Sequence, residues 1–324
     1  MKKSPAIVIE NLSKHYKLLK AVDRISLKVE SGEVFALLGP NGAGKTTTIS
    51  MLCGLLMPTS GSANVAGFDV SKDPISVRKM IGVVFQQPSV DDLLSGKENL
   101  EMHALLYGVP AEKRKERIAD MLGLVGLTER KDSQVKEYSG GMRKRLEIAR
   151  GILHWPKILF LDEPTVGLDP QTRQHIWQYI KKMSQREGTT VVFTTHYLEE
   201  AEQFADRVAI IDHGKIIKVG TPKEMVDSLG GDSVRLSTGN PKAMLLQLKR
   251  MKFATNVRMD GKAVCANISK PHQNLPKLLK LLLNVDSIEI HTASLNDVFI
   301  KYTGREIREE SGEGGFMERI MNNK

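Results

Sequence analysis

The feature that most limits how this 324-residue chain can fold is a glycine-rich loop near its N-terminus. The apolar run Val34–Leu38 leads into the loop, and a helical pattern over Thr46–Leu56 follows it. The loop fits G-x-x-x-x-G-K-[ST], in which backbone N–H groups converge on phosphate oxygens at the positive end of a helix. It predicts a nucleoside triphosphate site in an α/β domain, formed by Gly39, Pro40, Asn41, Gly42, Ala43, Gly44, Lys45, Thr46 and Thr47.

Two side chains of this loop and an acidic pair later in the chain carry the chemistry. Lys45 can reach the β- and γ-phosphates, and the Thr46 hydroxyl can ligate Mg²⁺. A buried strand over Ile158–Leu161 would place Asp162 beside the loop, where it can hold Mg²⁺ directly or through water. Glu163, one residue on, can polarise an attacking water. An isolated Asp-Glu pair would more often be a surface turn, and it is the phosphate loop that favours a catalytic role here.

A third motif, Ser139-Gly140-Gly141, comes just before the helix predicted over Arg143–Leu153. Small residues at a helix N-terminus can bind an anion. The chain already has one phosphate loop, however, and one nucleotide seldom needs two. Two interpretations therefore stay open: Ser139 is an ordinary N-cap, or the motif completes a nucleotide site on a second molecule in a dimer.

Residues 1–225 show the pattern of an α/β domain with a mostly parallel sheet, because short runs that are apolar throughout suit strands buried on both faces. A hairpin of Ile7–Ile9 with Ile25–Val29 predicts an antiparallel β addition. The polar stretch Asp91–Lys131 predicts a helical insertion, within a helical subdomain of about residues 89–150. The expected strands of the main sheet are Val34–Leu38, Ile81–Phe85, Ile158–Leu161, Thr190–Thr194 and Val208–Ile211, the last turning back at Asp212-His213-Gly214-Lys215 toward Val219.

After residue 225 the pattern changes to β, α, β, β, α, β, the order of a small ferredoxin-like α+β domain over residues 226–304. Residues 305–324 read as a tail, loose over Ser311–Lys324. The expected elements are a strand at Ser233–Ser237, a helix at Lys242–Met251, a hairpin of Asn256–Met259 with Ala263–Ile268, a helix at His272–Asn284 and a strand at Ser287–Ile290.

Composition excludes several classes of protein. The two cysteines, Cys53 and Cys265, are too few for a disulfide framework or a zinc site. No apolar run reaches the roughly 18 residues of a membrane helix, and the N-terminus lacks a signal-peptide pattern. The formal charge of +9 is spread along the chain, so we expect no nucleic-acid partner. These features predict a cytoplasmic protein.

Together the motifs resemble the nucleotide-binding subunit of an ABC transporter, over about Ile7 to Pro222. Gly39–Thr46 is similar to its Walker A motif, and Leu161–Glu163 to the end of its Walker B motif. Ser139-Gly140-Gly141 is similar to the signature loop, and Thr165–Asp169 to the D-loop. Three single residues also match the family: the Q-loop glutamine Gln86, the switch histidine His196, and Tyr16, where the family stacks an aromatic ring on adenine.

The resemblance implies a P-loop ATPase that binds ATP and Mg²⁺ between two ATPase chains, either two copies of this chain or this chain and a paralogue. Ser139 and Gly141 of one chain would contact the γ-phosphate held by Lys45 of the other. Asp169 would join the two sites. Each of these roles is implied by the family pattern.

The resemblance also implies a link from the nucleotide to a membrane partner. His196 would sense the γ-phosphate and steady the water near Glu163. Gln86 would be a ligand of the metal site and connect it to the partner. The family's signature commonly reads Leu-Ser-Gly-Gly-Gln, whereas this chain has Tyr138 first and Met142 last, so the usual glutamine contact is missing.

Two further segments, His196–Glu202 and Ala293–Gly304, resemble the ATPases of drug and antibiotic exporters of the daunorubicin-resistance type. This implies an ATPase that drives a separate multi-span permease from the inner face of the membrane. A soluble ABC ATPase acting on ribosomes or DNA is the alternative, although such relatives typically carry two cassettes or a coiled-coil insertion. A third hypothesis is a scaffold protein that does not hydrolyse ATP. The presence of Lys45, Asp162, Glu163 and His196 argues against it.

Overall fold

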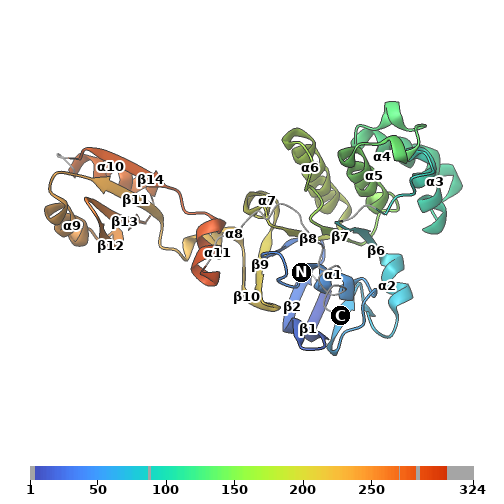
Figure 1. Cartoon of the computed structure of the whole chain (residues 1–324), viewed down its shortest axis with the longest axis horizontal. Coiled ribbons are helices and arrows are strands. Elements are labelled where there is room, and N and C mark those ends of the chain that lie inside the picture. The colour runs from blue at the N-terminus through green and yellow to red at the C-terminus, as the bar shows by residue number, and fades with distance from the viewer. Residues whose placement is uncertain (1–3, 87–88, 270, 282–284, 305–324) are drawn as a thin grey trace. The chain divides into compact units, whose positions relative to one another are not determined.

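The computed structural model describes residues 4–86, 89–269, 271–281 and 285–304, which form two compact units that divide between Val219 and Gly220 (Figure 1). The sequence pattern changes slightly later, at residue 225. The predicted tail, residues 305–324, lies outside the described residues. No helix in the described part of the chain is both long and apolar enough to cross a membrane.

The first unit is built on a six-stranded sheet in the order β10-β9-β3-β8-β7-β6. Its five strands from β9 to β6 run parallel, which confirms the predicted parallel sheet. Strands β3, β7 and β8 are buried along their whole length, as expected from the short, mostly apolar runs that form them. The bounds are β3 (Val34–Leu38), β6 (Ile81–Val84), β7 (Ile158–Asp162), β8 (Thr190–Thr195), β9 (Arg207–Asp212) and β10 (Lys215–Gly220).

A second, antiparallel sheet has the order β2-β1-β4-β5. Ile7 pairs with Val29, which confirms the predicted hairpin, although both of its strands are longer than expected. Apolar residues of this sheet, of β3 and of α1 form one continuous core. We did not predict β4 and β5, because Ser60-Gly61-Ser62 shows no apolar alternation. The bounds are β1 (Pro5–Tyr16), β2 (Leu19–Glu30), β4 (Ser60–Val65) and β5 (Phe68–Asp69).

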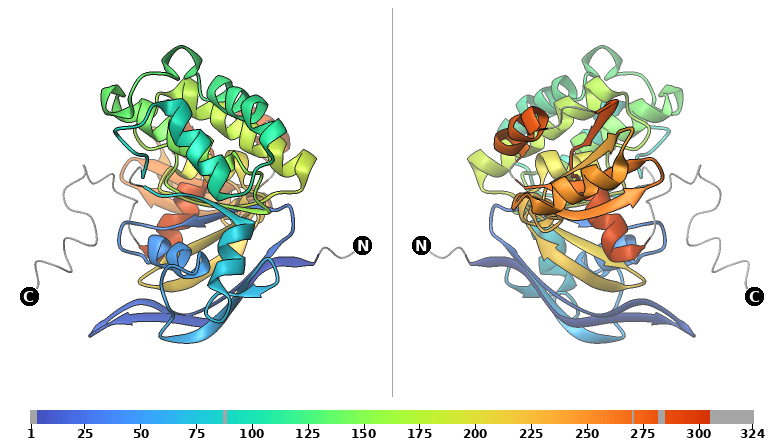
Figure 2. Two further views of the ribbon diagram at one scale, coloured as in Figure 1. Left: turned by 90° about the vertical axis from the view of Figure 1, so that its right-hand side faces the viewer. Right: turned by 90° about the vertical axis from the view of Figure 1, so that its left-hand side faces the viewer.

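Helices α3, α4 and α5 pack against one another and confirm the helical insertion. Figure 2 shows this group on one side of the six-stranded sheet and the antiparallel sheet on the other. The helical segments of the unit are α1 (Lys45–Leu52), α2 (Pro74–Met80), α3 (Gly96–Leu106), α4 (Ala111–Leu124), η1 (Thr128–Arg130), η2 (Val135–Glu137), α5 (Gly140–Ile152), α6 (Pro170–Glu187) and α7 (Leu198–Phe204).

The second unit has a four-stranded antiparallel sheet in the order β12-β13-β11-β14, with its own apolar core. This is the strand order of the predicted ferredoxin-like fold. Of the helix predicted over His272–Asn284, residues 282–284 lie outside the described residues. The bounds are α8 (Pro222–Asp227), β11 (Asp232–Ser237), α9 (Pro241–Arg250), β12 (Ala254–Asp260), β13 (Ala263–Ile268), α10 (Pro271–Leu281), β14 (Ser287–His291) and α11 (Leu295–Thr303).

The C-terminal motif Ala293–Gly304 forms α11 of this second unit. Ser294 begins the helix in a capping box with Asp297, whose carboxylate accepts from the Ser294 backbone N–H at 2.9 Å. Val298 and Phe299 are fully buried. Helix α11 contacts α8, and its apolar residues lie outside the apolar cluster beneath the four-stranded sheet.

Candidate active site

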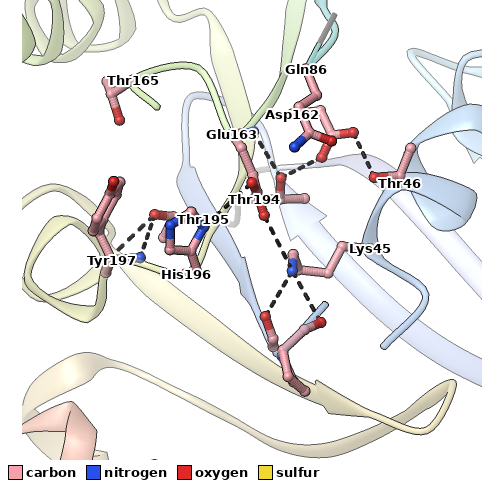
Figure 3. Close-up of polar contacts among 12 residues, drawn as sticks. Lys45, Thr46, Gln86, Asp162, Glu163, Thr165, Thr194, Thr195, His196 and Tyr197 are labelled. Atoms are coloured by element: carbon pink, nitrogen blue, oxygen red, sulfur yellow. Dashed lines mark hydrogen bonds and ion pairs between the residues drawn. The ribbon is translucent and has the colours of Figure 1, made fainter. Parts of the chain in front are cut away.

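The glycine-rich loop connects β3 to α1, as its sequence predicts (Figure 3). The Lys45 ammonium donates to the carbonyl oxygens of Gly39 at 2.7 Å and Pro40 at 3.2 Å. At Gly44 the backbone φ is +104°, and a Cβ there would lie 2.4 Å from the carbonyl oxygen of Ala21. Only glycine fits this position, so the sharp turn that presents the loop depends on it.

The carboxyl end of β7 brings Asp162 to the first turn of α1. The Thr46 hydroxyl donates to Asp162 Oδ2 at 2.7 Å, and the Thr194 hydroxyl donates to Oδ1 at 2.5 Å. Asp162 is 1% exposed, so these bonds fix both carboxylate oxygens. A hydroxyl and a carboxylate are hard oxygen donors of the kind that Mg²⁺ prefers. The pair therefore fits a magnesium ion.

Glu163 lies between a lysine and a histidine. Its Oε1 is 3.4 Å from the Lys45 ammonium, and its Oε2 is 3.3 Å from His196 Nδ1 (Figure 3). Its backbone N–H donates to the Thr194 hydroxyl at 3.0 Å, which holds the residue at a φ of +48°. A positive φ is rare for a non-glycine residue and clusters at functional sites.

The same neighbours control the ionisation of Glu163. Burial raises the pKa of this carboxyl, but the contact with His196 and the charge of Lys45 outweigh burial and hold the pKa below its ordinary value of 4.5. Glu163 is therefore an anion at neutral pH. This is the form that can orient a water and accept its proton.

Gln86 follows β6, the strand next to β7, with Val84 opposite Leu161. This register places Gln86 near the end of β7 that carries Asp162, and in the view of Figure 3 its exposed side chain points toward that carboxylate. The structure thus brings Gln86 to the predicted metal site.

Helix α5 holds the backbone on both sides of residues 87–88. Lys144 Nζ donates to the carbonyl oxygens of Phe85 at 2.8 Å and Gln86 at 3.2 Å. Glu147 accepts from the Ser89 backbone N–H at 3.1 Å, and Arg150 donates to the Ser89 carbonyl oxygen at 2.7 Å. We did not predict these contacts of α5 with the backbone at Phe85, Gln86 and Ser89. The available signal was the three-residue spacing of Lys144, Glu147 and Arg150, which places charged side chains on one face of an otherwise buried helix.

Ser139 is the N-cap of α5, and its hydroxyl accepts from the Met142 backbone N–H at 3.3 Å. Ser139 and Gly140 are exposed, and in the described part of the chain no hydrogen bond or ion pair joins them to Lys45. Tyr138, which stands where the family has leucine, is buried and donates its hydroxyl to the Arg130 carbonyl oxygen at 2.6 Å. The substitution is thus accommodated as a packing contact.

Tyr16 and Asp169, the two remaining predicted site residues, lie at the end of β1 and at the start of α6. Tyr16 is the last residue of β1. Two residues before it, Lys14 pairs with Val22 of β2. The Val22 side chain lies beside Gly44 of the phosphate loop, 3.3 Å from where a Cβ of that glycine would be. The end of β1 therefore lies near the phosphate loop. Asp169 is the exposed N-cap of α6 and accepts from the Thr172 backbone N–H at 2.9 Å.

Comparison with known proteins identifies the class to which this fold and site belong. Residues 22–166 match the ABC transporter family. The chain is 42% identical over 315 residues to the daunorubicin/doxorubicin resistance ATP-binding protein DrrA of Streptomyces peucetius, covering 95% of each chain. It belongs to the ABC transporter ATP-binding proteins, and it is an ATPase of that family.

Two solved structures share the fold of the first unit. One is a dimeric ATP-binding cassette, MJ0796, in a post-hydrolysis state with ADP and Pi; it is 28% identical, with a TM-score of 0.63, over 66% of this chain and 98% of that one. The other is cbiO1 of Clostridium perfringens, part of the ABC transporter complex cbiONQ, 29% identical with a TM-score of 0.62 over 70% and 92%. They confirm the predicted P-loop ABC ATPase fold.

Proposed function

We propose that Glu163, Lys45 and His196 carry out ATP hydrolysis in this ATPase. The observation that supports this most is the placement of the ionised Glu163 between Lys45 at 3.4 Å and His196 at 3.3 Å. Glu163 would orient a water for attack on the γ-phosphorus and accept its proton as the new O–P bond forms. The bond to the bridging oxygen breaks, and ADP and phosphate leave.

The neighbouring residues would bind the nucleotide. The loop Gly39–Thr47 would cradle the phosphates through its backbone N–H groups and Lys45, and Tyr16 would stack on adenine. Thr46, Asp162 and Gln86 would hold Mg²⁺, which neutralises charge on the β- and γ-phosphates when bound.

We further propose that two such chains act as a dimer, in which Ser139, Gly140 and Gly141 of one copy complete the nucleotide site of the other. The exposure of Ser139 and Gly140 at the N-terminus of α5 supports this assignment, as does the dimeric state of the related cassette. Asp169 would contact the other site across the same interface. Either a second copy or a paralogous ATPase would satisfy this arrangement.

The chain would drive export through a separate multi-span permease at the inner face of the membrane. Its likeness to a drug-resistance protein over 95% of both chains supports export, and its likeness to a subunit of a transporter complex supports a membrane partner. The second unit would regulate or strengthen dimerisation. The comparisons do not favour an ATPase acting on ribosomes or DNA.

The test is a Glu163→Gln variant of the full chain. Loss of the carboxylate base is expected to lower ATP turnover by at least about 100-fold while ATP binding persists. Exposed Glu199→Gln is the matched control and is expected to keep wild-type turnover. Turnover retained in Glu163→Gln would remove Glu163 from the mechanism.

The same variant tests the partner. Because it would bind ATP and stall before hydrolysis, tagged Glu163→Gln recovered from detergent-solubilised cells with ATP is expected to carry a polytopic membrane protein, identified by mass spectrometry. Recovery of ribosomes or nucleic acid without a membrane protein would contradict the transporter function.

A further inference from the structure

A buried carboxylate, Glu200, lies beside the active site, but within the described residues no hydrogen bond or ion pair joins it to Lys45, Glu163 or His196. It is in the first turn of α7 and is 4% exposed. One of its oxygens accepts from the Thr165 hydroxyl, and the other accepts from the Thr195 hydroxyl at 2.8 Å. Arg173 Nε of α6 is 3.8 Å away. A charge this deeply buried persists only when its oxygens are paired, so the two threonines and Arg173 hold Glu200 in place.

The Thr195 hydroxyl sets the position of His196. It donates to Glu200 and also accepts from the Tyr197 backbone N–H at 2.9 Å, so it fixes the backbone on both sides of the histidine. Figure 3 shows Thr195, His196 and Tyr197 in this arrangement. The preceding residue, Thr194, points to the opposite face of β8 and bonds Asp162. Of these two successive threonines, Thr194 therefore bonds the metal-site residue Asp162, and Thr195 bonds Glu200.

The Thr165 hydroxyl fixes a different loop. Thr165 follows Glu163 by two residues, and its carbonyl oxygen accepts from the Leu168 backbone N–H at 3.1 Å, directly before Asp169. A shift of the 165–169 loop would pull the Thr165 hydroxyl from Glu200 and leave a buried carboxylate oxygen unpaired. Since that is unfavourable, Glu200 and the Thr195 hydroxyl would move with the loop.

We propose that Glu200 is a positioning residue that couples the 165–169 loop to the switch histidine His196. This inference rests on the proposed roles of Asp169 and His196. A contact made by Asp169 across the dimer would be transmitted through Thr165, Glu200 and Thr195 to the 3.3 Å contact of His196 with Glu163. Glu200 thereby makes hydrolysis at one site depend on the loop that faces the other.

The test is a double-mutant cycle in the full chain with Thr165→Val and Thr195→Val. Each change keeps the shape of the side chain and removes one hydroxyl from Glu200. Each is expected to lower kcat by about tenfold and to change KM for ATP by less than about twofold. The double variant is expected to be no slower than the slower single variant, because breaking either bond already uncouples the loops. Thr165→Ser and Thr195→Ser keep the hydroxyl and should retain most of kcat.

Thr190→Val is the matched control. Thr190 lies in the same strand, is equally buried, and its hydroxyl accepts from the Gly32 backbone N–H at 3.0 Å. It is expected to lower the melting temperature as much as Thr195→Val while leaving kcat unchanged.

Unchanged kcat in both Thr165→Val and Thr195→Val, or effects that multiply in the double variant, would overturn the coupling. Glu163→Gln separates the two proposals. If the threonine variants overturn the coupling while Glu163→Gln abolishes turnover, the proposed mechanism stands and only the coupling fails. If Glu163→Gln retains turnover, the proposed mechanism fails, and the coupling fails with it.

Discussion

At the residue scale, Glu163 shows how three neighbours determine the state of one side chain. Its carboxylate is paired with Lys45 and His196, and its backbone N–H bonds Thr194. Its pKa is lower in the folded chain than its ordinary value because these contacts outweigh burial. The unfolded chain therefore binds more protons than the folded chain in the acid range, so this group stabilises the fold above that ordinary value and loses its contribution as pH falls.

This makes a prediction for acid stability. The free energy of unfolding in urea, measured from about pH 6 down to about pH 3, is expected to fall more steeply for the wild type than for Glu163→Gln, which has no carboxyl to protonate. The difference is expected to develop below the ordinary pKa of 4.5. The control is Glu199→Gln, an exposed carboxylate with the same change in charge. Parallel curves for the wild type and Glu163→Gln would show that the pKa of Glu163 is the same in the folded and the unfolded chain, which would contradict the prediction.

At the element scale, α5 joins the signature residues at its N-terminus to the backbone around Gln86. Glu147 is fully buried, bonds the backbone N–H and hydroxyl of Ser89, and pairs with Arg150 at 2.6 Å. Lys144 holds Phe85 and Gln86 on the other side. One helix thus fixes the backbone at Phe85 and Gln86 and at Ser89. The family resemblance implies that Gln86 connects the metal site to the membrane partner.

Glu147→Gln is expected to destabilise the first unit by about 3 kcal/mol, because removing the carboxylate leaves Arg150 without its buried partner. The measurement is the urea midpoint of unfolding at neutral pH. Glu116→Gln in α4 changes an exposed carboxylate in a neighbouring helix and should shift the midpoint little. Equal shifts in the two variants would mean that the buried pair contributes no more than a surface charge.

At the scale of the whole molecule, each of the two units has its own core. We therefore expect two unfolding transitions in calorimetry. Leu236→Ala, in the core of the second unit, is expected to destabilise one transition by about 2–5 kcal/mol and to leave KM for ATP unchanged. Leu159 is fully buried in β7 of the first unit, so Leu159→Ala should lower the temperature of the other transition. A single transition lowered by both variants would mean that the units unfold together.

The sequence by itself determined the elements that depend on local chemistry. The glycine pattern defined the loop between β3 and α1, and short, mostly apolar runs identified β3, β7 and β8. His213 and Gly214, with φ of +45° and +74°, confirm the predicted turn of the β9–β10 hairpin. The motifs also identified the ABC family correctly. These features follow from residues that are close in sequence, where periodicity and turn chemistry act directly.

Only the tertiary structure decided which distant residues meet. Glu147 pairs with Ser89, 58 residues away, and Glu200 pairs with Thr165, 35 residues away. Helical spacing can show that Glu147 lies on a charged face of α5, but no pattern in the sequence identifies either partner. Strand β4 likewise forms because β1 provides a partner edge, and β4 in turn provides the edge with which β5 pairs; this pairing outweighs their weak β propensity. A buried charge can be recognised only with its partner, and packing of helices and strands brings the partners together.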